Sequence, residues 1–244
     1  MDFNYNNPFI KFLETIANLL IISFFTLLGC IPIVTAVTAF SAGYYTLIRV
    51  VYGPSKGRGV SKGFFNAFKD NLKLGIKLNL VLLVAIFFLV VGVYAGWQIY
   101  KTGILGTVYF AFGILLSIIF VAAVTYIPPV LAHFEGSVLS IVRLSLYFSS
   151  QRLFVSLFNG ALLIFLIWSI EIFPLALLIV PGLYLDLIRP GIEKEIAKFL
   201  KEYNIEEDNQ KVEISTEEDE VPEELSSVDI DKKFSDQRKK NRRK

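Results

Sequence analysis

The 244-residue chain has one cysteine and one histidine, and this scarcity excludes several kinds of chemistry. A lone cysteine cannot form an intrachain disulfide, and one cysteine with one histidine cannot supply the ligands of a structural zinc site. No Ser-His-Asp, paired-carboxylate or metal-ligand pattern is recognisable, because nothing in the sequence places the histidine beside a nucleophile. We therefore expect no metal, no cofactor and no enzymatic activity.

Charged residues are also scarce over most of the chain. Hydrophobic residues make up 54% of the full sequence, and its mean hydropathy is +0.57. A soluble globule must cover itself with polar side chains, so this composition is unsuited to one. Uncharged runs occupy 15–48, 78–100, 102–131, 153–170 and 172–185. A bilayer core of about 30 Å needs about 20 helical residues, which most of these runs supply or nearly supply. The sequence predicts an all-α, polytopic transmembrane helical bundle.

We place a transmembrane domain over residues 1–189 and predict five spans, at about 15–40, 78–99, 104–127, 153–170 and 172–188. Lysine and arginine favour the cytoplasmic side of a membrane. The loop after the first span is strongly basic, with Arg49, Lys56, Arg58, Lys62, Lys69, Lys73 and Lys77. We expect these residues to contact anionic lipids, each adding about 1 kcal/mol at the surface. This predicts a multi-pass protein of the cell membrane with an outside N-terminus and a cytoplasmic C-terminus.

A six-span alternative stays open. The uncharged run 15–48 would be roughly 50 Å long as a helix, well beyond one bilayer crossing. Pro32 lies in its middle, and proline interrupts helical hydrogen bonding, so two crossings could hinge there. Against this, 33–48 contains several threonines and tyrosines and makes a weakly apolar span.

Polar residues around this proline form a candidate cavity, made of Pro32, Thr35, Thr38 and Ser41. Interrupted helices line the substrate sites of many transporters. The plainer interpretation is that these hydroxyls satisfy backbone groups freed by the proline or bond across helices.

Three further features concern helix packing, proton transfer and a charged pair. Gly92 and Gly96 have the spacing of close helix–helix contacts, which leaves association with a second copy open. His133, with Glu135 nearby, could relay protons, but a lone histidine without a titratable partner is usually structural. Asp186 can pair with Arg189 at i, i+3 spacing.

The charge pattern changes near Pro190. We predict an amphipathic juxtamembrane helix over 190–204 and a disordered, charged tail over 205–244. Residues 202–231 hold thirteen acidic residues against one lysine, and 232–244 hold eight basic residues against one aspartate. Low hydrophobicity with blocks of like charge is typical of disorder. The basic end could touch anionic lipid, nucleic acid or the acidic block; we expect a solvated tail without a specific nucleic-acid partner.

Three segments resemble the YesL-like family of bacterial membrane proteins, also known as domain of unknown function 624: 18–35 with its Ile31-Pro-Ile-Val-Thr35, 39–50 with its Gly43-Tyr-Tyr45, and 64–72 with its Phe64-Phe-Asn-Ala-Phe68. A weaker likeness continues through 129–134 and 140–145, so that it covers roughly residues 8–200. The chain departs from the usual family pattern at 36–38, where Ala-Val-Thr stands in place of a common Gly-Pro step.

The resemblance implies no catalytic residues, because the family has no established activity. It suggests an accessory or regulatory component linked to carbohydrate transport, with transport-system membrane subunits as partners. The alternative is a small solute transporter that uses the polar cavity near Pro32.

Overall fold

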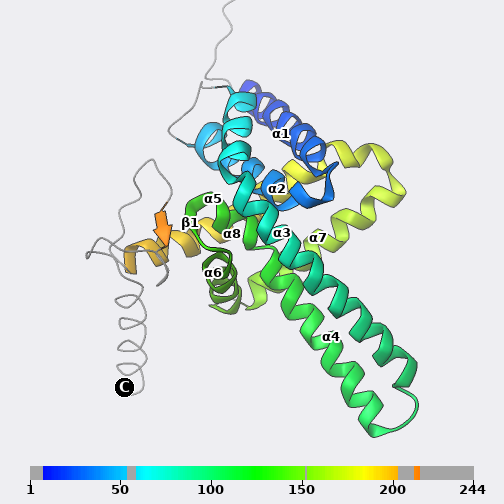
Figure 1. The fold of residues 1–244 in the computed structure, drawn as a ribbon. Helices are drawn as coiled ribbons and strands as arrows, with labels where there is room; N and C mark the ends of the chain where they lie inside the picture. Colours follow the sequence, from blue (N-terminus) through cyan, green and yellow to red (C-terminus); the bar gives the residue numbers. More distant parts are fainter. Residues whose placement is uncertain (1–7, 54–58, 152, 203–211, 215–244) are drawn as a thin grey trace, which may run out of the picture.

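The computed structural model describes residues 8–53, 59–151, 153–202 and 212–214, and within these ranges the chain is almost entirely helical. Figure 1 shows helices gathered around α2, with the hairpin of α3 and α4 extending away from them. The elements are α1 (Pro8–Cys30), η1 (Ile33–Thr35), α2 (Ala36–Thr46), η2 (Leu47–Val51), α3 (Val60–Ile99), α4 (Ile104–Val124), α5 (Ile127–His133), β1 (Phe134–Gly136), α6 (Val138–Gln151), α7 (Leu153–Ile172), η3 (Pro174–Leu178), α8 (Val180–Glu202) and β2 (Val212–Ile214).

The helical structure is interrupted at Pro32, between α1 and α2. α1 ends at Cys30, and a short 3-10 turn, η1, leads into α2. The Thr35 hydroxyl lies 2.6 Å from the carbonyl oxygen of Gly29 and 2.8 Å from that of Pro32, so it satisfies a backbone acceptor at the break. The predicted single span 15–40 is therefore wrong as one helix: it is divided between two helices, as the six-span alternative required at this point.

α2 lies in the middle of the bundle, in contact with α1, α3, α5 and α8. Most of its residues are buried, including Thr38, Ser41 and Tyr44. Glycines allow the close approach: a side chain at Gly43 would meet Thr26 of α1 and Leu185 of α8. Neighbouring helices rather than lipid thus surround this weakly apolar segment.

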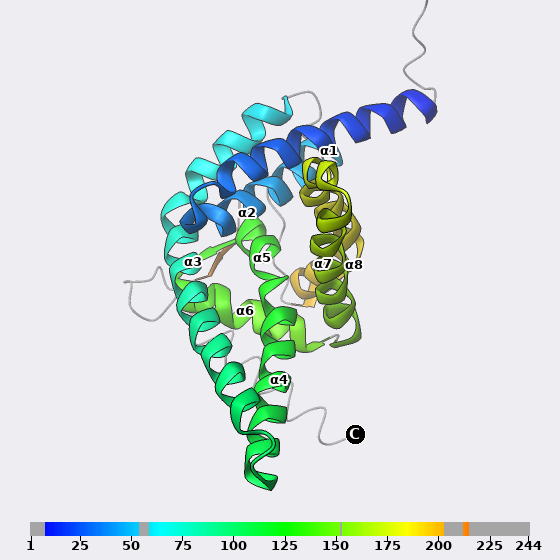
Figure 2. The same cartoon turned by 90° about the vertical axis from the view of Figure 1, so that its right-hand side faces the viewer.

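α3 is 40 residues long, about 60 Å at 1.5 Å per residue, or twice the thickness of a bilayer core. Its amino-terminal half packs on α1 and α2, where Gly63 meets Val50 and Gly75 meets Thr38. Its carboxyl-terminal half contains the predicted span 78–99 and pairs with α4, which occupies 104–124 of the predicted span 104–127. Figure 2 shows these two antiparallel helices projecting beyond the other helices.

After α4 the chain passes through the short helix α5 and strand β1 into α6. β1 pairs in parallel with β2, with Phe134 opposite Val212 and Gly136 opposite Ile214. β2 thus forms a strand within the tail predicted to be disordered; the rest of 205–244 lies outside the described residues.

The bounds of the last helices differ from those predicted from the sequence. The predicted span 153–170 lies within α7, but 172–188 is not one helix, because it is divided between the end of α7, η3 and the start of α8. α8 then continues through Pro190 to Glu202 and joins this segment to the predicted juxtamembrane helix 190–204. Proline removes one hydrogen-bond donor, yet the helix is continuous on both sides of Pro190.

Within the part of the chain that the structure describes, four helical segments are long and apolar enough to cross a membrane: Phe12–Cys30, Ile33–Val51, Val60–Ile99 and Ile104–His133. The bent pair Val138–Gln151 and Phe154–Ser169, which turns by 106°, makes a fifth if it is one broken span. The chain is therefore a helical membrane protein, as its composition predicted.

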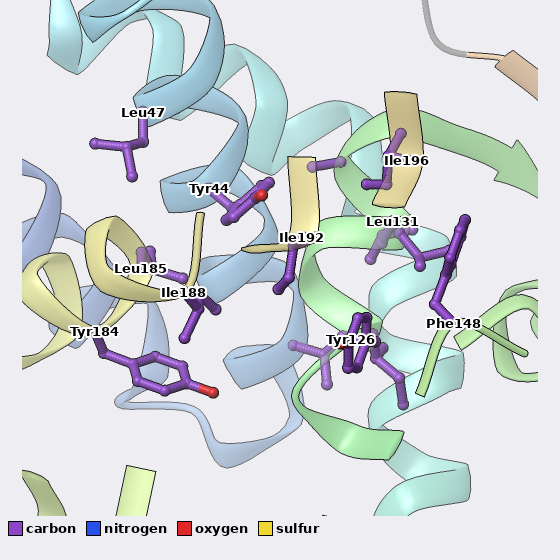
Figure 3. Packing of buried hydrophobic residues seen from close by; sticks show 14 of the residues in the cluster. Tyr44, Leu47, Tyr126, Leu131, Phe148, Tyr184, Leu185, Ile188, Ile192 and Ile196 are labelled. Atoms are coloured by element: carbon purple, nitrogen blue, oxygen red, sulfur yellow. The ribbon is translucent and has the colours of Figure 1, made fainter. Parts of the chain in front are cut away.

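The described part of the chain has one main apolar core, where α2, α5, α6 and α8 meet (Figure 3). Tyr44, Leu131, Phe148 and Ile192 are all nearly inaccessible to solvent. This core holds the polar groups described next.

Candidate functional site

Three polar side chains from separate helices meet at one side of the main core. His133 ends α5, Glu193 lies on α8 and Tyr44 lies on α2. The Tyr44 hydroxyl donates a hydrogen bond of 2.6 Å to Glu193 Oε1, and His133 Nε2 lies 3.5 Å from Glu193 Oε2. We call these three residues the His–Glu–Tyr cluster. It connects α8 to the centre of the bundle.

The local backbone fixes the histidine. α5 ends because Phe134 adopts an extended conformation, and this leaves His133 on the last turn. Its Nδ1 lies 3.0 Å from the carbonyl oxygen of Pro129, one turn earlier. The His133 side chain is 3% exposed and that of Glu193 is 34% exposed, so the cluster lies at the boundary of the core.

The electrostatics of the cluster favour an ionised Glu193. Burial, the largest influence, raises the pKa of Glu193, but the hydrogen bond and charge of His133 lower it, as do the Tyr44 hydroxyl and the Arg189 charge. The net pKa lies below the ordinary glutamate value. The carboxylate is therefore held by partners from α2, α5 and α8 itself.

A second polar group lies one turn earlier on α8. The Arg189 guanidinium stacks over the Tyr52 ring, 3.9 Å from its centroid, and Arg189 Nε lies 3.4 Å from Asp186 Oδ1. The predicted i, i+3 pair of Asp186 and Arg189 is confirmed. Arg189 thus connects α8 to the residue that follows η2 and adds positive charge near Glu193.

The expectation that His133 has no titratable partner is wrong. Glu193 is 60 residues away in the sequence and reaches the histidine only because α8 returns across α2 and α5. The apolar residues Ile188, Ile192 and Ile196 mark the buried face of α8. They would have placed Glu193 near the edge of that face, but nothing in the sequence pairs it with His133. Glu135 is exposed on β1.

The residues of the candidate polar cavity take part in helix contacts. Pro32 is exposed, and Thr35 satisfies backbone oxygens at the helix break. Thr38 packs on the backbone of Gly75, and Ser41 Oγ lies 3.5 Å from Asn71 Nδ2 of α3. The hydroxyls are thus distributed along the interfaces of α2.

The candidate packing glycines face α4 within the same chain. A Cβ at Gly96 would lie 3.1 Å from the Phe110 Cα, and one at Gly92 would lie 3.7 Å from the Tyr109 hydroxyl. The pair therefore belongs to the α3–α4 hairpin, where small residues allow close approach.

Four of the seven candidate lipid contacts form an exposed stripe on α3: Lys62, Lys69, Lys73 and Lys77. At 100° per residue they fall within about 80° of one another around the helix. Lys56 and Arg58 lie outside the described residues, and Arg49 lies on η2. We call Lys62, Lys69, Lys73 and Lys77 the lysine stripe.

Among the described residues, no group of three or more His, Cys, Asp and Glu side chains could hold a metal ion.

Comparison with known proteins finds a match for part of the chain. Residues 15–93 match the family model described as protein of unknown function, DUF624. The predicted resemblance to this family is confirmed over that segment. No curated protein and no solved structure matches the chain.

The DUF624 segment covers most of α1, the break at Pro32, α2 and most of α3. It includes Tyr44 and the lysine stripe, but not His133 or Glu193. The description of DUF624 assigns no activity, so function must be argued from the site itself.

Proposed function

We propose that this protein is a non-enzymatic accessory or regulatory component of a carbohydrate transport system in the cell membrane. The observation that carries the choice of an accessory role is that Thr35, Thr38 and Ser41 lie in helix contacts of α2 rather than together around an open cavity. The family resemblance supports the link to carbohydrate transport. Partner subunits would be contacted through the cytoplasmic half of α3 and the tail.

The distribution of side chains along α3 supports the orientation. Lys77 and Trp97 are separated by 20 residues, about 30 Å of helix, which is the thickness of a bilayer core. Tyr94 and Trp97 are 64% and 56% exposed, and such rings favour the membrane–water interface. This distribution supports our proposal that the lysine stripe faces the cytoplasm and the α3–α4 turn lies outside; in the same proposal the C-terminus is cytoplasmic.

Photo-crosslinking in native membranes tests the accessory role. A photoreactive amino acid at Phe65, 51% exposed beside the lysine stripe, should capture a membrane subunit of a transport system. The same group at Phe112, 57% exposed on α4, is the matched control and should react only with lipid. Failure of Phe65 to capture any transport protein, under conditions where Phe112 labels lipid, would contradict the proposal.

Binding of anionic lipid by the lysine stripe is tested separately. The chain with Lys62, Lys69, Lys73 and Lys77 changed to Gln should retain less anionic lipid in native mass spectrometry. Each lysine adds about 1 kcal/mol at the surface. Lys101→Gln in the α3–α4 turn is the control and should leave retention unchanged. Equal loss in both variants would show that the stripe has no special role.

A transporter is the second candidate, and one observation favours it. The hydroxyls of Thr26 and Thr38, on α1 and α2, are buried without a hydrogen-bond partner among the described residues. Such hydroxyls could serve a solute. If they do, Thr26→Val and Thr38→Val should abolish solute flux while the protein stays folded. Normal uptake in both variants would remove this candidate.

A further inference from the structure

The neighbours of the two His133 ring nitrogens determine where the protons lie. The Pro129 carbonyl oxygen can only accept, so Nδ1, at 3.0 Å, carries a proton and donates it. Nε2 then faces Glu193 Oε2 at 3.5 Å. If the imidazole were neutral with its proton on Nδ1, a bare nitrogen lone pair would face a carboxylate.

The contact between His133 and Glu193 therefore needs one shared proton. With the proton on Nε2, the pair consists of an imidazolium and a carboxylate, which attract each other. Without that proton, two acceptors face each other at the edge of the core, and the contact becomes repulsive. Imidazole is the side chain that ordinarily changes charge between pH 5 and 8.

We propose that the His–Glu–Tyr cluster is a proton-operated latch that fastens α8 to α2 and α5. A proton on His133 Nε2 closes the latch, and its loss to solvent as the pH rises opens it. Tyr44 keeps its hydrogen bond to the Glu193 carboxylate in both states, so the step at His133 controls the opening.

The other charged and titratable groups around the cluster are consistent with a latch that opens when His133 loses its proton. The positive charge of Arg189, on the preceding turn of α8, interacts with both Glu193 and Tyr44. An arginine keeps this charge over the whole pH range in which proteins are studied. Tyr126, at the start of α5, acts on Tyr44. The cluster and its surroundings thus contain one fixed cation, two phenols, one carboxylate and one imidazole.

The latch lies where the carboxyl-terminal part of the chain is attached to the helical bundle. β1 begins at Phe134, directly after His133, and pairs with β2 from the tail. α8 and β2 therefore both join the bundle beside the same histidine. Opening the latch would loosen the region where the carboxyl-terminal part of the chain is held.

Nuclear magnetic resonance of labelled histidine tests the proton assignment without any mutation. His133 is the only histidine, so the full chain in lipid nanodiscs, purified without a histidine tag, gives one pair of ring ¹⁵N signals. We expect both nitrogens to be protonated at mildly acidic pH, and Nε2 alone to lose its proton as the pH rises. Loss of the Nδ1 proton first would overturn the proposal.

Amide hydrogen exchange tests the mechanical effect. In the wild-type chain, exchange in α8 over 190–200, corrected for the chemical rate, should become on the order of tenfold faster from pH 5.5 to 8.5. Glu193→Gln should remove this dependence, because its amide can donate to a neutral Nε2. Glu135→Gln changes an exposed carboxylate nearby and should behave like the wild type. Exchange that ignores pH in the wild type, or retains its dependence in Glu193→Gln, would overturn the latch.

Discussion

The backbone of Gly75 on α3 lies directly against the hydroxyl of Thr38 on α2, so a side chain at position 75 would overlap it. This contact brings the two helices together at the middle of the segment that matches DUF624. The close approach allows α2 to be covered by α3 in spite of its polar residues.

Gly75→Ala should destabilise the protein by about 1–3 kcal/mol, because the new methyl group forces α2 and α3 apart. Gly92→Ala is the matched control on the same helix. Its methyl group would make an ordinary contact, 3.7 Å from the Tyr109 hydroxyl. Thermal unfolding in detergent measures the difference, and equal melting temperatures for the two variants would contradict the packing described.

α1 and α8 cross closely at Gly182. The backbone N–H of Gly182 donates to Ser23 Oγ at 2.8 Å, and the Ser23 hydroxyl donates to the Ile179 carbonyl oxygen at 3.2 Å. Ser23→Ala should therefore reduce the free energy of unfolding by about 1–3 kcal/mol, since a buried donor loses its partner.

Gly182→Ala should have a similar or larger effect, because its methyl group would approach the Leu19 carbonyl oxygen to 2.5 Å. Gly191→Ala on the same helix is the control, since its methyl group would meet Val155 at an ordinary 3.4 Å. Protease resistance in membranes provides the measurement. A Gly191→Ala chain as weak as Gly182→Ala would argue against this crossing.

The helix break at Pro32 depends on the Thr35 hydroxyl. Thr35→Val keeps the shape of the side chain but removes the bond to the Gly29 or Pro32 carbonyl oxygen, and should cost about 1 kcal/mol. Thr35→Ser retains the hydroxyl and should remain closer to the wild type. If chemical unfolding gives the reverse order, the hydroxyl does not stabilise the break.

Acid should also weaken the attachment of α8, because it protonates the Glu193 carboxylate that faces His133 and Tyr44. The pKa of Glu193 is lowered in the folded protein, so its carboxylate stabilises the fold above the unfolded glutamate pKa of about 4.3. That stability is lost as the pH falls through the lower, folded pKa. The stability difference between wild type and Glu193→Gln should therefore shrink as the pH is lowered from 6 to 3. A difference that stays constant would contradict the ionised Glu193.

Much of the fold is predictable from length and hydropathy. The apolar runs at 78–99 and 153–170 fall within α3 and α7, and the proline at 32 marks a real break. The boundary between the predicted last span and the juxtamembrane helix is not predictable from charge, because α8 passes through Pro190 without ending.

The candidate site is less predictable from the sequence than the fold. Local spacing predicts the Asp186–Arg189 pair, since both residues lie on one helix. The contact of His133 with Glu193 depends on how α8 returns across the bundle, and a single sequence contains no signal for that pairing. Thr38 and Ser41 illustrate a similar limit, because a polar residue in an apolar run can face either a cavity or a neighbouring helix.

Cysteine accessibility tests the membrane arrangement most directly, because Cys30 is the only native cysteine and can be replaced by Ala. In that background, Lys73→Cys and Lys101→Cys report on the lysine stripe and on the α3–α4 turn. A membrane-impermeant maleimide applied to intact cells should label position 101 and should label position 73 only after the cells are opened. Labelling of position 73 in intact cells, with position 101 protected, would contradict the account.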